Sequence, residues 1–128
     1  MKDFRELLES DENSSHFIRM LKRIHLGAYE LSIQASTCHY SIPNKTLVNL
    51  FDYEAMEVAV FKNKDWINVE EDSLFDEWEE REQFLKDYDG MVARYIPIRM
   101  IQSLCDYIDE NQKATGCMVN VASEKVIV

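Results

Sequence analysis

A strict alternation of apolar and polar side chains in residues 29–36 constrains the fold of this chain more than any other feature. Tyr29, Leu31, Ile33 and Ala35 are apolar, and the residues between them are polar. Successive side chains of a β-strand point to opposite sides, so this period of two predicts a strand with one buried face. After Ser36 the apolar positions change parity, which either a bulge or a strand break would explain.

Further segments predict partners for this strand. Residues 56–61 alternate, residues 62–65 form a polar turn, and residues 66–69 are again strand-like, which together predict an antiparallel hairpin. The apolar run 91–96 predicts another strand. The Val-rich end of the chain predicts one or two terminal strands, at 117–122 and 125–128.

Four segments predict helices. The first runs from Lys2 to about Glu12, and the third is the acidic stretch that begins at Asp72 or Ser73 and ends near Gly90. The second and fourth segments carry apolar side chains at helical spacing. In the second, before Gly27, these are Phe17, Met20 or Leu21, and Ile24. In the fourth, after Pro97, they are Ile101, Leu104, Cys105 and Ile108. The sequence therefore predicts one compact α+β domain, residues 1–128, with a mainly antiparallel sheet packed by about four helices.

The negative charge of the chain is confined to its central third. The net charge is −10, and residues 70–89 alone hold ten acidic and two basic side chains, a net charge of −8. Like charges repel, so this composition argues against nucleic acid or an anionic membrane as a direct partner. It favours a basic partner protein.

The predicted acidic helix has an apolar side and a charged side. Trp78 and Leu85 are expected to anchor it to the sheet. Its outer faces would then present the candidate partner-binding side chains Asp76, Glu77, Glu79, Glu80, Glu82, Gln83 and Asp87. Two interpretations fit this pattern: a solvated helix face, or a rigid array of anions that occupies a basic groove on a partner.

The only basic cluster precedes the first predicted strand. It contains Arg19, Lys22 and Arg23, with His16 and His25 nearby. A solvated helix face would explain this cluster, and so would an intramolecular contact with the acidic helix.

No motif for catalysis, metal or cofactor binding occurs in the chain, so neither a metal nor a cofactor is expected. HExxH, CxxC, GxSxG and EF-hand patterns are absent. Cys38 and His39 are neighbours, but in a strand they would point to opposite faces. Three cysteines without a signal peptide predict a cytoplasmic protein, and the longest uncharged stretch is too polar to span a membrane.

The segment from Asp52 to Ile108, DYEAMEVAVFKNKDWINVEEDSLFDEWEEREQFLKDYDGMVARYIPIRMIQSLCDYI, resembles the short, acidic, single-domain proteins encoded by phages and mobile elements. The resemblance is to a class of proteins and spans under half of the chain. Many members of this class are anti-defence proteins, including anti-CRISPR proteins. Immunity proteins that neutralise bacterial toxins share the same size and acidity.

These observations favour a non-enzymatic inhibitor that binds a basic, nucleic-acid-handling protein, such as a CRISPR effector or another nuclease, through its acidic helix. An immunity protein against a cationic toxin is the alternative. A small hydrolase that uses Cys38 or clustered carboxylates is a third interpretation. The apolar residues 126–128 would also allow a homodimer through a strand edge.

Overall fold

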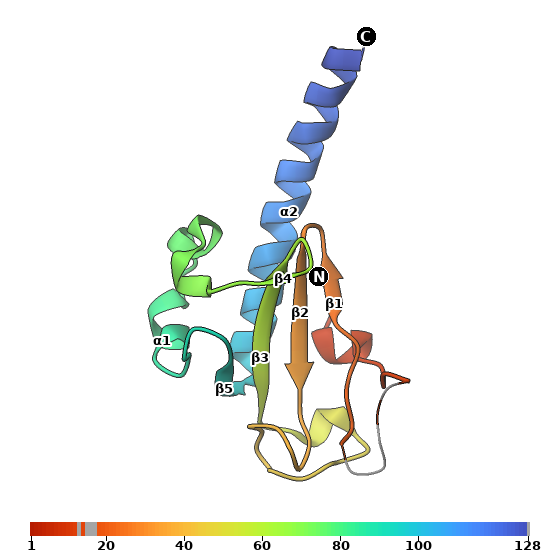
Figure 1. Cartoon of the computed structure of the whole chain (residues 1–128), viewed down its shortest axis with the longest axis vertical. Helices are drawn as coiled ribbons and strands as arrows, with labels where there is room; N and C mark the ends of the chain where they lie inside the picture. Colours follow the sequence, from red (N-terminus) through yellow and green to blue (C-terminus); the bar gives the residue numbers. More distant parts are fainter. Residues whose placement is uncertain (13, 15–17, 128) are drawn as a thin grey trace.

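The computed structural model describes residues 1–12, 14 and 18–127, and for residues 114–127 it describes the backbone only. Its centre is an antiparallel sheet of five strands, crossed on one side by a long C-terminal helix (Figure 1). The strands are β1 Ile24–Leu26, β2 Tyr29–Gln34, β3 Ala55–Lys62, β4 Asp65–Trp66 and β5 Ala93–Pro97. The strand predicted at residues 29–36 is confirmed as β2, and it ends at Gln34 rather than continuing through a bulge.

The register of the sheet sorts its side chains onto two faces. Leu31 lies opposite Val60, and Ile33 lies opposite Val58, all four fully buried. The intervening pairs Glu30–Phe61, Ser32–Ala59 and Gln34–Glu57 therefore belong to the other face. We call these two faces the inner and outer faces of the sheet. β3 occupies the centre, because it pairs with β2 along one edge and with β4 and β5 along the other.

Tight turns connect the strands and fix one contact with the helix. Asn63 and Lys64 join β3 to β4 with positive φ angles of 52° and 72°, as the common two-residue hairpin turn requires. Gly27 joins β1 to β2 with φ of 64°. A Cβ atom on Gly27 would lie only 2.5 Å from Oε1 of Gln112, the same oxygen that accepts a hydrogen bond from the Ala28 N–H at 2.9 Å. Glycine is needed there because the helix approaches the turn so closely.

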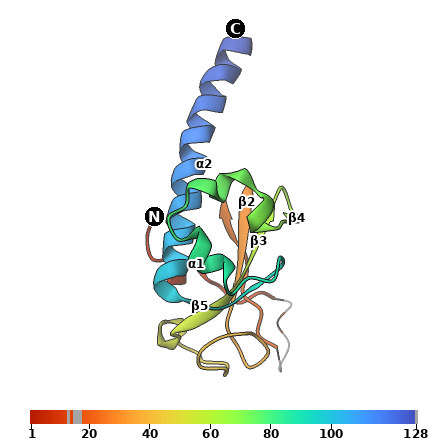
Figure 2. The same cartoon turned by 90° about the vertical axis from the view of Figure 1, so that its left-hand side faces the viewer.

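The helix α2, Ile98–Ile127, covers the inner face of the sheet (Figure 2). Ile101, Leu104, Cys105 and Ile108 are fully buried, so the apolar stripe predicted after Pro97 is the face that contacts the core. The C-terminal part of α2 projects beyond the sheet (Figure 1).

The predicted fold class is wrong in its helices. Within the described residues the structure has two α-helices, α2 and the five-residue α1 Arg81–Leu85, instead of about four, so the fold is α+β only in a loose sense. The first predicted helix is a single 3₁₀ turn, η1 Phe4–Leu7, and a second turn, η2 Leu50–Asp52, precedes β3. The remaining 3₁₀ turns belong to the acidic stretch.

The second and terminal segments also differ from the prediction. Residues 18–26 contain an extended run and strand β1 instead of a helix, and Gly27 is a hairpin residue rather than a helix cap. His16 and Phe17 lie outside the described residues. Residues 117–122 and 125–127 continue α2, so the terminal strands are wrong and the strand edge suggested for a homodimer is not formed there. Val128 lies outside the described residues.

Candidate partner-binding surface

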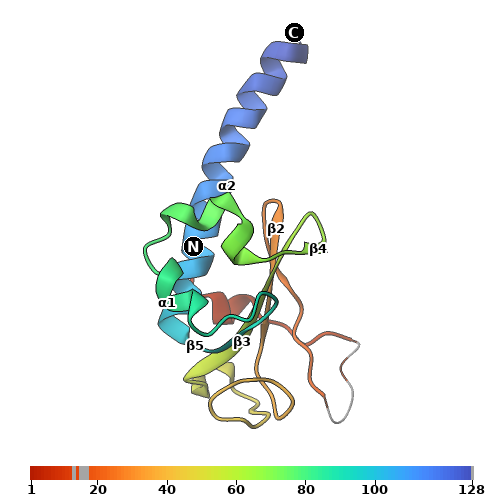
Figure 3. The ribbon, with the colours of Figure 1, turned by 60° about the vertical axis from the view of Figure 1, so that its left-hand side comes forward.

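The acidic segment, residues 70–89, is a chain of short turns rather than one helix (Figure 3). It contains η3 Val69–Glu71, η4 Ser73–Glu77 and α1. Asp72 separates η3 from η4, and its side chain accepts a hydrogen bond from the Leu74 N–H. Trp78 follows η4 with extended backbone angles, φ −74° and ψ 122°, which ends helical geometry there. The predicted continuous acidic helix is therefore wrong.

Three aromatic side chains fix the acidic segment to the rest of the molecule. Phe75 and Phe84 are fully buried, and Trp78 is 4% exposed. The indole Nε1 of Trp78 donates to Ser103 Oγ at 3.1 Å, so Trp78 is fixed to α2, a contact that the sequence did not predict. Tyr107 of α2 donates its hydroxyl to the Leu74 carbonyl. Because buried aromatic residues carry large apolar areas, these contacts hold the turns in one arrangement.

Most of the predicted partner-binding side chains lie in solvent. Exposed residues are Asp76, Glu77, Glu79, Glu82, Gln83 and Asp87. Glu80 differs, because it is only partly exposed and its carboxylate is 2.7 Å from the Arg99 guanidinium of α2. Glu82 pairs with Arg81 at 2.8 Å, and Gln83 accepts a hydrogen bond from Lys86. Glu80 therefore has a structural partner that the sequence pattern did not indicate.

Many carboxylates of the acidic segment form no ion pair with a residue that the structure describes. Within the described part of the chain, ion pairs reach Asp72, Glu80, Glu82 and Asp89. The other six acidic residues of the segment form none with described residues, and they are Glu70, Glu71, Asp76, Glu77, Glu79 and Asp87. The arginines and the lysine of the basic cluster bind other groups. Arg23 pairs with Glu30, Lys22 pairs with Glu9, and Arg19 donates to the carbonyls of Ala35 and Leu47.

Two carboxylates of α2 lie next to the acidic segment, and one of them, Asp106, pairs with the N-terminal ammonium at 3.2 Å. A hollow of about 430 Å³ between η4 and α2 is bordered by Glu77, Glu79, Asp106 and Glu110, with Trp78 among its lining residues. Burial, followed by the charges of Glu77 and Asp76, raises the pKa of Tyr107 above its ordinary value. Asp106 and Glu110 were not predicted. They are four residues apart on the polar side of the fourth predicted helix, and this spacing is the sequence pattern that would have placed them on one exposed face.

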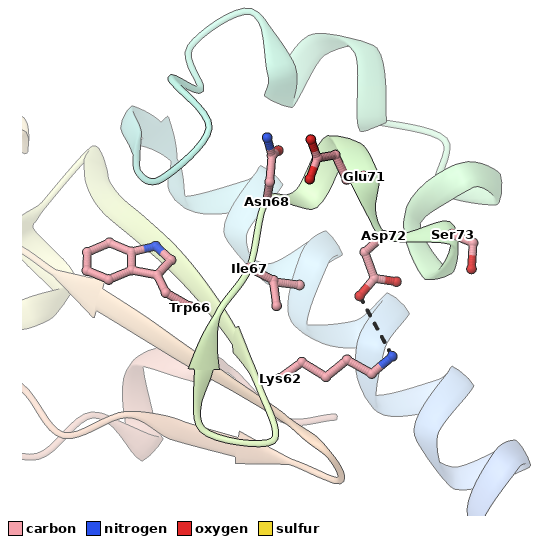
Figure 4. A pocket seen from close by; sticks show the side chains of 7 residues that line it. All are labelled: Lys62, Trp66, Ile67, Asn68, Glu71, Asp72 and Ser73. Carbon is pink, nitrogen blue, oxygen red and sulfur yellow. Dashed lines mark ion pairs between the residues drawn. The ribbon is translucent and has the colours of Figure 1, made fainter.

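A second hollow, of about 480 Å³, lies where β3 and β4 meet the start of the acidic segment (Figure 4). Lys62 extends from the end of β3 toward Asp72, and their charged atoms are 4.0 Å apart. The same carboxylate accepts a hydrogen bond from the Tyr29 hydroxyl at 2.7 Å. Burial and this hydrogen bond raise the pKa of Tyr29 above its ordinary range. Asp72 is thus engaged in holding the segment against the sheet.

The described residues offer neither a metal-binding cluster nor a membrane-spanning helix. No group of three or more His, Cys, Asp or Glu side chains in this part of the chain is arranged to hold a metal ion. Among the same residues, no helix combines the length and apolar character needed to cross a membrane.

Comparison with known proteins does not assign the chain to a family. No family model matches it, and neither a curated protein nor a solved structure matches it significantly. Function is therefore inferred from the geometry of the surface described above.

Proposed function

We propose that this protein is a non-enzymatic inhibitor or interaction protein that binds a basic, nucleic-acid-handling partner protein through the acidic segment. The observation that carries the proposal is a set of exposed carboxylates without ion pairs to described residues, on turns pinned by Phe75, Trp78 and Phe84. A fixed array of anions is preorganised for a cationic groove, since little side-chain and loop ordering is required on binding.

Electrostatics explains why the partner is expected to be basic. Exposed carboxylates that already repel one another gain when cations approach, and complementary potentials raise the rate of association. Solubility does not require eight of the ten net negative charges to lie within residues 70–89. A partner that handles nucleic acid has the basic groove that such an array fits.

Two triple variants with the same net charge test this proposal. Asp76, Glu77 and Glu79 are exposed carboxylates of the acidic segment, and all three are changed to lysine in the first variant. The control changes Glu12, Asp52 and Glu54, which are exposed elsewhere in the chain, to lysine. Each variant raises the formal net charge from −10 to −4.

The experiment immobilises wild type and both variants, exposes them to lysate of the native host, and identifies the captured proteins. We expect basic nucleic-acid-binding proteins on wild type and on the control, and their loss on the acidic-segment variant. Capture of a defence effector would identify an anti-defence inhibitor, whereas capture of a toxin would identify an immunity protein. Equal capture by both variants would contradict the proposal, because net charge alone would then explain binding.

A further inference from the structure

The outer face of the sheet carries a hollow that the proposed function does not use. It has a volume of about 320 Å³ and is lined by Ser32 of β2, by Glu57, Ala59 and Phe61 of β3, and by Trp66 of β4, among others. Ser32 lies directly opposite Ala59, so two small side chains form its floor. Larger side chains on the outer face of the sheet surround these two small ones.

One end of this hollow is aromatic. Phe61 and Trp66 are cross-strand partners with ring centroids 5.0 Å apart. Trp66 is 47% exposed although its indole N–H donates to the Met91 carbonyl at 2.7 Å, so its position is fixed while its ring remains accessible. Phe61 already contacts one guanidinium, that of Arg23, whose central carbon is 3.7 Å from the ring centroid. Arg23, which also lines the hollow, thus covers Phe61, which is 6% exposed, so the exposed ring of Trp66 is the aromatic surface left for the apolar stem of an arginine.

The other end carries a partly buried carboxylate. Glu57 lies two residues before Ala59 on β3, and it forms no ion pair with any residue that the structure describes. The one hydrogen bond that a described residue donates to it, from the Tyr40 N–H, is long at 3.5 Å. Burial lowers the pKa of His39, which also lines the hollow, below its ordinary value. A partly buried anion without a cation gains when one is supplied.

We propose that this hollow binds one arginine side chain of a partner protein. The arginine stem lies over Ala59, against Trp66, and the guanidinium donates to Glu57. Strand geometry places Glu57 and Ala59 about 6–7 Å apart, a distance that the stem and head of arginine span. The planar guanidinium matches a carboxylate with two parallel hydrogen bonds, which a lysine ammonium cannot form. The choice of a cationic occupant rests on the proposed function, which requires a basic partner.

The test titrates the isotopically labelled full-length protein with N-acetyl-arginine amide and follows its amide resonances by NMR. N-acetyl-citrulline amide is the probe control, because it has nearly the same shape without the charge. We expect saturable shifts around Glu57, Ala59 and Phe61 with the arginine probe, and affinity weaker by at least about tenfold with the citrulline probe.

Three variants locate the binding. Glu57→Gln keeps the shape of the side chain and should weaken arginine binding by at least about tenfold. Ala59→Leu fills the floor of the hollow and should abolish binding while the charge of Glu57 remains. Glu54→Gln removes the same charge from an exposed position outside the hollow and should leave binding unchanged.

The outcomes separate this inference from the proposed function. Shifts confined to residues 70–89 would overturn the arginine site and leave the acidic segment as the only binding surface. Equal shifts with the citrulline probe would overturn it in favour of an uncharged occupant. Absence of saturable shifts with the arginine probe would overturn it outright. Loss of partner capture in the acidic-segment variant is measured independently, so either proposal can fail without the other.

Discussion

Tyr95 gives a sharp test of the backbone geometry on the outer side of β5. Its φ is 55°, in the left-handed region where side chains other than glycine are strained. It lies at a register shift between Met56 and Val58, where the β5 strand carries an extra residue. Its ring is 45% exposed and contacts Tyr40 edge-on at 5.7 Å. The bulge thus presents an aromatic side chain to solvent at the expense of backbone strain.

The perturbation compares glycine with alanine at this position. Both substitutions remove the ring and its contact with Tyr40, so their difference isolates the backbone. In an ordinary strand glycine is less stable than alanine by roughly 0.5–1 kcal/mol. At Tyr95 the relief of left-handed strain, about 1–2 kcal/mol, opposes that loss. We therefore expect Tyr95→Gly to be more stable than Tyr95→Ala by about 0.5–1 kcal/mol.

The neighbouring Arg94 provides the control, because it is exposed in the same strand and does not have a positive φ. There, Arg94→Gly should be less stable than Arg94→Ala by roughly 0.5–1 kcal/mol. Urea denaturation followed by circular dichroism measures all four free energies of unfolding. If glycine is the less stable residue at both positions, the left-handed assignment of Tyr95 is wrong.

Three further predictions concern stability and reactivity. Trp78→Ala should lower the free energy of unfolding, measured by urea denaturation, by about 3–5 kcal/mol. Ser103→Ala removes only the hydrogen-bond acceptor of the indole and should lower it by about 1 kcal/mol. Equal losses would show that Trp78 does not anchor the acidic segment. Burial lowers the folded-state pKa of His39, so the unfolded chain binds more protons than the folded chain. The free energy of unfolding should therefore fall as pH drops below about 6.5, by at most about 1.4 kcal/mol per pH unit from this group. The His39→Gln variant should lack that component of the pH dependence. Burial raises the pKa of the Cys105 thiol to about 12, whereas Cys38 is exposed. Peptide mapping after alkylation at pH 8 should therefore show Cys38 modified well before Cys105. The reverse order would contradict the packing of α2.

The two long central strands, β2 and β3, were predictable because their alternating pattern reports geometry directly, whereas β1 lies where a helix was predicted. Alternation at residues 29–36 and 56–61 marks two strands, and the polar turn between residues 62 and 65 fixes their hairpin neighbour. The same pattern does not identify which face α2 covers at each position. It therefore gave no indication of the hollow over Ala59 on the outer face.

The helices were harder to predict because short apolar stripes fit more than one conformation. Leu21 and Ile24 are buried at helical spacing, yet they lie in extended chain, where the Leu21 N–H and carbonyl bond to the Gln34 side chain. In the acidic segment Phe75 lies in a 3₁₀ turn, Trp78 in extended chain and Phe84 in α1, so these buried aromatics do not form the stripe of one continuous helix. Repulsion between neighbouring carboxylates weakens a continuous helix further.

The candidate surface was predictable in composition but not in its connections. The exposure of Asp76, Glu77 and Glu79 follows from charge, because unpaired carboxylates are rarely buried. The ion pair between Glu80 and Arg99 joins segments that are distant in sequence, as does the position of Asp106 and Glu110 next to the acidic segment. Such contacts depend on the packing of the acidic segment against α2, which local sequence patterns do not encode.

The most direct test of the proposed function measures binding of a fluorescent oligo-arginine peptide, or of the captured partner, to the two charge-matched triple variants at increasing salt. An exposed ion pair contributes about 0.2–1 kcal/mol. Reversing three carboxylates removes three attractions and adds three repulsions. The binding free energy of the acidic-segment variant should therefore be weaker by about 3 kcal/mol, roughly 100-fold in affinity. The loss should shrink as salt screens the charges, while the control variant stays close to wild type. Equal affinities of the two variants at low salt would contradict binding through the acidic segment.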